Sequence, residues 1–195
     1  MTTTHRTAPL DLEGALRAHI RAAQDVVDML PAIRVVAAVV CDAFAGDGRL
    51  FAFGNGGSAA EAQHLVAEFS GRFLRTRRPL PAMSLTTDAS VVTGIGNDFG
   101  FEMVFARQVR ALARRGDVVI AFTTSGRSRN VLEGLAAARD VGATTVLFGS
   151  VGGASALVPA HYQLLAASGD TARAQEIHLA IQHGICDAID EEAAR

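Results

Sequence analysis

Side chains able to bind a metal or move protons recur at helical spacing in two stretches of the sequence. His64 and Glu68 are four residues apart, so on a helix they share one face. Gln175 and His183 are eight apart, close to two turns, and would share a face as well. A His, a carboxylate, an amide oxygen and a second His could bind a divalent metal such as zinc. Spacing alone does not show whether His178 or His183 would complete such a site. It equally allows these residues to be ordinary neighbours on a helix that bind no metal.

A second group of chemical interest is a run of hydroxyl side chains that opens a predicted helix. Thr123, Thr124, Ser125 and Ser128 surround Gly126 directly after an apolar run. Helix N-termini present free N–H groups and attract anions, and hydroxyls add further donors. Ordinary N-capping would need only one of these hydroxyls. The run therefore favours a phosphate site.

The loop at residues 54–59 also bears on ligand type, because Gly54, Gly56 and Ala59 fit the dinucleotide pattern G-x-G-x-x-A. A lone match of this kind is weak, and a nucleotide-cofactor oxidoreductase would leave the hydroxyl run without a role. A sugar phosphate would use both loops. In that model Ser58 helps to hold the phosphate, while Asn55 and Asp98 bind sugar hydroxyls.

Short apolar runs alternate with helical patterns after residue 48, which predicts a parallel sheet covered on both faces. The runs lie at 50–53, 82–85, 118–122, 144–148 and 162–165. Helices are expected at 57–71, at 88–114 with a break around 94–100, at 127–141 and at 171–193. Ligands of such sheets bind at the carboxyl ends of the strands, where both loops described above lie.

Residues 11–45 show helical periodicity that Pro31 interrupts. Proline is common at the first position of a helix, so the pattern predicts two helices that end at residues 46–48. Such a pair cannot bury its apolar stripes alone. It must pack on the domain, on another subunit, or on both. Residues 1–10 are expected to be frayed.

Composition excludes several classes of protein. The chain has 195 residues, 49% of them apolar, and a net charge of −2, which argues against binding nucleic acid. All basic residues are Arg, so Schiff-base aldolases, pyridoxal enzymes and Walker-type ATPases are excluded, since each needs a Lys.

Cys41 and Cys186 are too few for a disulfide framework. No membrane span or signal peptide is evident, so we expect a cytoplasmic location.

Five blocks of sequence together resemble the phosphoheptose isomerases of the sugar-isomerase (SIS) domain family. The resemblance runs from the N-terminal helices to about Ile189. The blocks are Gly54–Ser58, Ala62–His64 with Glu68, Gly96–Gly100, Thr124–Ser128, and Gln175–His178 with His183.

The resemblance implies an α/β, flavodoxin-like sheet of five parallel strands with helices on both faces, assembled as a homotetramer through the N-terminal helical pair at 11–47. Residues 48–195 would then form the SIS domain. It also implies one zinc ion per subunit, held by His64, Glu68, Gln175 and His183. The implied substrate contacts are Asn55, Gly56, Gly57, Ser58, Glu68, Asn97, Asp98, Thr123, Thr124, Ser125, Ser128 and Gln175.

The implied reaction converts sedoheptulose 7-phosphate to D-glycero-D-manno-heptose 7-phosphate through an enediol, for bacterial heptose biosynthesis. Such an exchange needs a base near the carbon acid and a proton donor for oxygen, and we assign these roles to Glu68 and His183. The main alternative is a non-catalytic SIS-domain regulator that binds a replication initiator protein. Relatives of that kind tend to lack the complete metal set, which is present here.

Overall fold

Five parallel strands form the centre of the molecule. The computed structural model describes residues 11–152 and 158–193. The strand order is β2-β1-β3-β4-β5, the doubly wound order of flavodoxin-like folds. The strands are β1 (Leu50–Gly54), β2 (Ala82–Ser84), β3 (Val118–Phe122), β4 (Thr144–Ser150) and β5 (Tyr162–Ala166). The predicted fold class is confirmed, and each apolar run named from the sequence forms one of these strands.

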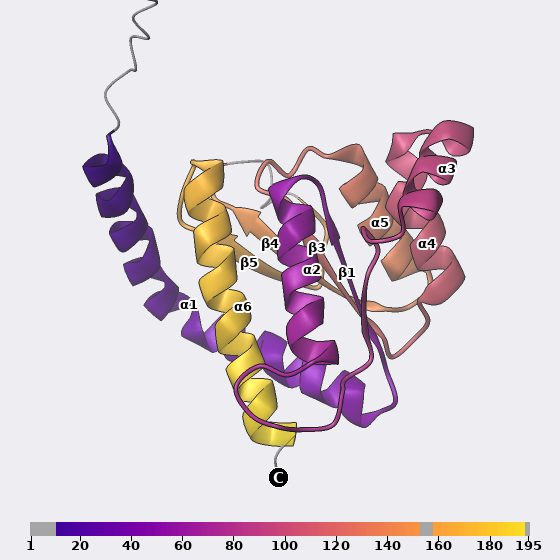
Figure 1. Ribbon diagram of the computed structural model, residues 1–195, viewed down its shortest axis with the longest axis horizontal. Coiled ribbons are helices and arrows are strands. Elements are labelled where there is room, and N and C mark those ends of the chain that lie inside the picture. The colour runs from indigo at the N-terminus through magenta and orange to yellow at the C-terminus, as the bar shows by residue number, and fades with distance from the viewer. Residues whose placement is uncertain (1–10, 153–157, 194–195) are drawn as a thin grey trace, which may run out of the picture.

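Helices cover both faces of the sheet, because side chains that alternate along each strand are apolar on both sides. Leu50 and Ala52 of β1 pack in a core with α1, α2 and α6, whereas Phe51 and Phe53 pack in a second core with α4 and α5. Figure 1 shows α1, α2 and α6 together on the near face. The helices are α1 (Leu12–Ala45), α2 (Gly57–Ser70), α3 (Ala89–Phe99), α4 (Val104–Leu112), α5 (Arg129–Asp140) and α6 (Thr171–Ala193).

The predicted N-terminal helical pair is wrong in one respect, since α1 is a single helix with Pro31 inside it. It begins where expected, at Asp11, whose side chain accepts a hydrogen bond from the Gly14 N–H at 2.8 Å. Proline inside a helix loses one hydrogen bond and forces a bend, at a cost of about 3 kcal/mol. Burial of Ile33, Val36 and neighbouring apolar residues beyond the proline offsets this cost. Figure 1 shows the helix changing direction part-way along its length.

The stretch predicted to be a broken helix at 88–114 divides at Gly100. That residue has φ +89°, a conformation that favours glycine, and it separates α3 from a 3-10 turn (Phe101–Met103) and α4. Among the residues of α3, none is buried. The C-terminal end of α3, which carries Asn97 and Asp98, is therefore held only by its junction with the turn and α4.

No helix within residues 11–152 and 158–193 is long and apolar enough to cross a membrane. The expectation of a frayed segment at 1–10 lies outside the described residues.

Candidate active site

The loops after β1 and β3 lie side by side, because these strands are neighbours in the sheet. The side-chain amides of Asn55 and Asn130 form two reciprocal hydrogen bonds of 2.8 Å each. Asn130 lies in the first turn of α5, is buried, and also accepts a hydrogen bond from the Val131 N–H. This pair joins the glycine loop to the hydroxyl loop, so both predicted substrate-binding loops form one surface.

The hydroxyl loop is folded by its own side chains. Thr123 Oγ1 accepts a hydrogen bond from the Gly126 N–H, and Ser125 Oγ accepts one from the Arg127 N–H, both at 3.2 Å. Thr124 Oγ1 lies 3.3 Å from Thr171 Oγ1 at the start of α6. Ser128 is the N-cap residue of α5, yet its side chain makes no capping hydrogen bond. Simple N-capping therefore does not account for Ser128.

Three of the predicted catalytic and metal-binding residues gather where α2 meets α6. His64 Nε2 lies 3.1 Å from His183 Nε2 and 3.5 Å from Glu68 Oε1. The Phe73 ring stacks on the His183 ring, with 5.2 Å between ring centroids. The His64 side chain is 42% exposed and that of Glu68 is 22% exposed, so a ligand can reach them. The cluster combines a carboxylate with two accessible imidazoles.

Gln175 and His178 occupy different positions along α6. The side chain of Gln175 lies against Gly57 at the beginning of α2, about 10 Å along the helix from His64. A Cβ atom at position 57 would collide with the side-chain amide of Gln175 as it lies here, so glycine permits this close approach. His178 turns towards the sheet and bonds to the Gly149 carbonyl at 2.7 Å. Of the two competing histidines, His183 is the one that meets His64.

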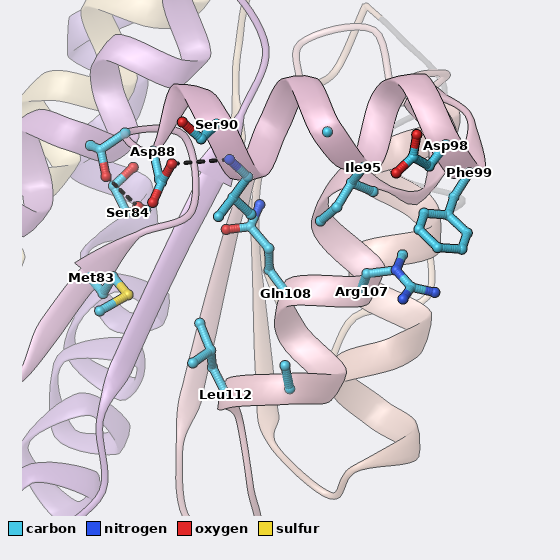
Figure 2. Close-up of a pocket in the computed structure, with 14 residues that line it drawn as sticks. Met83, Ser84, Asp88, Ser90, Ile95, Asp98, Phe99, Arg107, Gln108 and Leu112 are labelled. Carbon is cyan, nitrogen blue, oxygen red and sulfur yellow. Dashed lines mark hydrogen bonds between the residues drawn. The ribbon is translucent and has the colours of Figure 1, made fainter.

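Asn97 and Asp98 lie apart from this cluster. The Asn97 side-chain amide donates to Asp98 Oδ1 at 2.7 Å, and both residues are exposed. Asp98 lines a pocket of about 570 Å³ between α3, α4 and the edge strand β2. Figure 2 shows Asp98 beside Phe99 at one end of this pocket, where the Arg107 guanidinium lies 3.6 Å from the centre of the Phe99 ring. The pocket does not include residues of α2 or α6.

Both cysteines are free thiols in the structure. Burial, followed by the negative charges of Glu68 and Asp190, raises the pKa of Cys186 to about 12. Burial is also the largest cause that raises the pKa of Cys41. A raised pKa disfavours the thiolate form at neutral pH, which argues against a nucleophilic role for either thiol.

Sequence reasoning missed Asn130, Thr171 and the buried pair formed by Glu61 and His178. Asn130 carries a weak signal, since it follows the hydroxyl run by two residues. Thr171 and the Glu61–His178 pair depend on contacts between helices far apart in the chain, and periodicity along one helix does not contain that information.

Comparison with known proteins identifies the class of this fold. Residues 17–150 match the model of the SIS domain. The chain is 38% identical to phosphoheptose isomerase GmhA from Neisseria gonorrhoeae, with a TM-score of 0.86 over 93% of this chain and 97% of that one. A phosphoheptose isomerase from Francisella tularensis gives a TM-score of 0.89 at 32% identity, over 95% of this chain and all of the other. The chain therefore belongs to the SIS domain family.

The sequence comparison narrows this assignment. The chain is 47% identical over 169 residues to "Phosphoheptose isomerase" of Aquifex aeolicus, an alignment that covers 87% of this chain and 85% of the relative. Within the SIS domain family, the chain groups with the phosphoheptose isomerases.

Proposed function

We propose that the chain is an aldose–ketose isomerase that converts sedoheptulose 7-phosphate to D-glycero-D-manno-heptose 7-phosphate in bacterial heptose biosynthesis. One observation carries the proposal. In a chain 47% identical to a named phosphoheptose isomerase, Glu68 and His183 both approach His64, at the junction of α2 and α6. That arrangement offers a base and an acid within reach of one small substrate.

Phosphate binding, proton transfer and sugar binding are assigned to different residues. The hydroxyls of residues 123–128, with Ser58 and the N-terminus of α5, bind the phosphate and fix the sugar chain. Glu68 removes a proton from C1 of the ketose and returns it to C2, and His183 supplies and recovers the proton that moves between the oxygens. Asn55, held by Asn130, contributes an amide to the sugar hydroxyls.

The proposed zinc site is supported by the spacing of two donor pairs. Tetrahedral zinc with bonds of about 2.0–2.1 Å places neighbouring ligand atoms about 3.3 Å apart. The His64–His183 and His64–Glu68 separations of 3.1 and 3.5 Å are close to this value. A zinc ion bound there would supply positive charge that polarises the substrate carbonyl. His64, Glu68 and His183 would hold it, with Gln175 as the fourth proposed ligand.

Other observations limit the zinc proposal. Within the described part of the chain, no group of three or more His, Cys, Asp or Glu side chains is already arranged to hold a metal ion. His64 is near both partners, whereas Glu68 and His183, both among the described residues, form no ion pair within 4.0 Å of each other. Gln175 lies further away, against Gly57. Side-chain rotation would be needed to bring all four donors to one ion.

The proposed homotetramer is supported by the N-terminal half of α1. Leu12, Leu16, Ile20 and Val27 of this half are all more than half exposed. A row of large apolar side chains left in water favours association with another subunit.

The regulator alternative has no comparable support, since the similar relatives are named as isomerases. The cytoplasmic location stays a prediction.

Turnover of sedoheptulose 7-phosphate, followed by NMR with and without a chelator, tests the proposed function. We expect Glu68→Gln to lower kcat by at least about 1,000-fold with the fold intact, because the amide cannot accept the carbon-bound proton. Glu191→Gln, which changes an exposed carboxylate on α6, is the matched control and should retain full activity. A wild-type protein that leaves the substrate unchanged, with zinc supplied, would refute the assignment.

A further inference from the structure

Three successive contacts join α2 to α6, and the candidate catalytic cluster is the last of them. From the beginning of α2, Gly57 meets Gln175, Glu61 meets His178, and His64 meets His183. The two helices run side by side in Figure 1. The relative position of α2 and α6 therefore determines whether His64 and His183 meet.

The middle contact is a buried pair of titratable groups. The His178 side chain is fully buried, and that of Glu61 is 10% exposed. His178 Nδ1 lies 3.2 Å from Glu61 Oε1. On the other side of the ring, Nε2 lies 2.7 Å from the Gly149 carbonyl oxygen of β4. The rings of Phe122 and Phe148 flank the imidazole.

These contacts determine where protons must lie. A carbonyl oxygen only accepts hydrogen bonds, so His178 Nε2 carries a proton and donates it to Gly149. In a neutral imidazole Nδ1 would then present a lone pair to Glu61, and a carboxylate would present another. Two lone pairs 3.2 Å apart repel in a buried site. The contact is therefore attractive only with a proton on one of these two atoms, as an ion pair at 3.2 Å; neither atom has the geometry of a hydrogen bond in the structure.

Such a pair is an inefficient way to stabilise a fold. Burial of charged or polar groups costs free energy, and a well-packed apolar pair is often as stable or more stable. Both carboxylate oxygens of Glu61 and Nδ1 of His178 lack a hydrogen-bond partner among the described residues, which increases this cost. A buried directional contact does, however, restrict how two helices can slide or rotate. Sliding is also opposed at the far end of α2, where Arg77 binds Asp190 of α6.

We propose that Glu61 and His178 are positioning residues for the isomerisation, and this inference rests on the proposed function. Their buried contact fixes the register of α2 against α6. Glu68 lies two turns after Glu61, and His64 lies one turn after it, so both move with that contact. The pair lies outside the candidate catalytic cluster, and it acts by holding His64 and Glu68 opposite His183.

The decisive comparison uses two variants at position 61. Glu61→Leu removes the contact, and we expect kcat to fall about 100-fold with KM within about threefold, because displacement of reacting groups by about 1 Å costs that much. Glu61→Gln provides an N–H that can donate to Nδ1 of a neutral His178, and we expect kcat within about fivefold of the wild type.

Asp117→Asn is the matched control for lost stability. Asp117 is fully buried at the amino ends of the strands, directly before the central strand β3, where it accepts hydrogen bonds from the N–H groups of Arg49 and Arg114. This variant should lower Tm without lowering kcat. The proposal is overturned if Glu61→Leu keeps kcat within about twofold, if Glu61→Gln is as impaired as Glu61→Leu, or if Asp117→Asn lowers kcat equally.

The wild-type protein provides a test that does not depend on any variant folding. A proton on the side of His178 that faces Glu61 should give a slowly exchanging downfield resonance in the proton NMR spectrum, separate from that of the Nε2–H bonded to Gly149, and Glu61→Leu should remove only that one. Absence of that resonance from the wild type would overturn the proposal. Failure of the proposed function is distinguishable, because the wild type would then show this resonance but no turnover of sedoheptulose 7-phosphate.

Discussion

His64 Nε2 and His183 Nε2 lie 3.1 Å apart, although 119 residues separate them in the chain. Two imidazoles at this distance are compatible when one donates a hydrogen bond to the other, or when both turn lone pairs towards a cation. The half-exposed position of His64 leaves the pair accessible. The same contact can therefore serve proton transfer and metal binding.

Zinc should stabilise the protein through this pair. A ligand that binds only the folded state at 100 times its Kd adds about 2.7 kcal/mol, so Tm should rise when zinc is added to chelator-treated protein. His64→Ala should abolish the rise, because it removes the residue that contacts both partners. His19→Gln alters a histidine that pairs with Glu176 outside the cluster, and it should keep the rise. An equal rise in His64→Ala would exclude His64 as a ligand.

Removal of the Ser125 hydroxyl should weaken substrate binding more than turnover. A hydrogen bond to a charged group contributes about 1.5–3 kcal/mol, which corresponds to a rise in KM of about 10- to 150-fold for Ser125→Ala. We expect kcat to change little, because the phosphate is held alike in ground and transition states. Steady-state kinetics separates the two effects, with Ser70→Ala as a control on α2. A large fall in kcat at unchanged KM would contradict this role.

The sheet could be predicted from the sequence because each strand is a continuous apolar run between turn residues. The helices after residue 48 could be predicted from their helical periodicity, and the break at Gly100 left a glycine signal. Pro31 was misinterpreted, because a local rule for helix starts takes no account of the tertiary contacts that keep α1 continuous. Sequence spacing likewise could not choose between His178 and His183. That choice depends on which side of α6 faces the sheet.

The same limit applies to contacts between distant segments. The Asn55–Asn130 and Glu61–His178 pairs each join two elements, and no pattern within either element marks the partner. For Asn97 and Asp98, the sequence implied a grouping that this structure does not show. The sequence resemblance groups them with the hydroxyl loop, whereas in the structure they lie at the end of α3 beside a separate pocket. Their role in substrate binding stays a prediction.

Charges placed on the exposed stripe of α1 should dissociate the assembly and leave each chain folded. Leu16 and Ile20 are 52% and 55% exposed, so Leu16→Glu with Ile20→Glu costs little within one chain. In a tetramer the same carboxylates would be buried without partners, which is strongly unfavourable. Light scattering after size exclusion should show a lower mass than for the wild type. Arg21→Glu, an exposed control on the same helix, should keep the wild-type mass, and a monomeric wild type would contradict the prediction.

The contact between Arg77 and Asp190 should make the protein sensitive to acid. Arg77 Nε donates to Asp190 Oδ1 at 2.6 Å, and its terminal nitrogens donate to the carbonyls of Glu68 and Phe69 at the end of α2. Burial alone would raise the pKa of Asp190. The backbone N–H groups of Arg75 and Leu74, with the hydrogen bond and charge of Arg77, outweigh that effect and hold the pKa below its usual value.

A carboxyl whose pKa is lower in the folded state stabilises the fold above its unfolded pKa, near 4, and loses that contribution as pH falls further. Wild-type Tm should therefore decrease as pH falls below about 4. Asp190→Asn should cost about 3 kcal/mol at neutral pH, because Arg77 is left buried without its counter-charge, and it should show a smaller loss in acid. Asp187→Asn changes an exposed carboxylate one turn earlier on α6 and should follow the wild-type curve. Identical acid profiles for wild type and Asp190→Asn would show that Asp190 ionisation does not stabilise this end of α2.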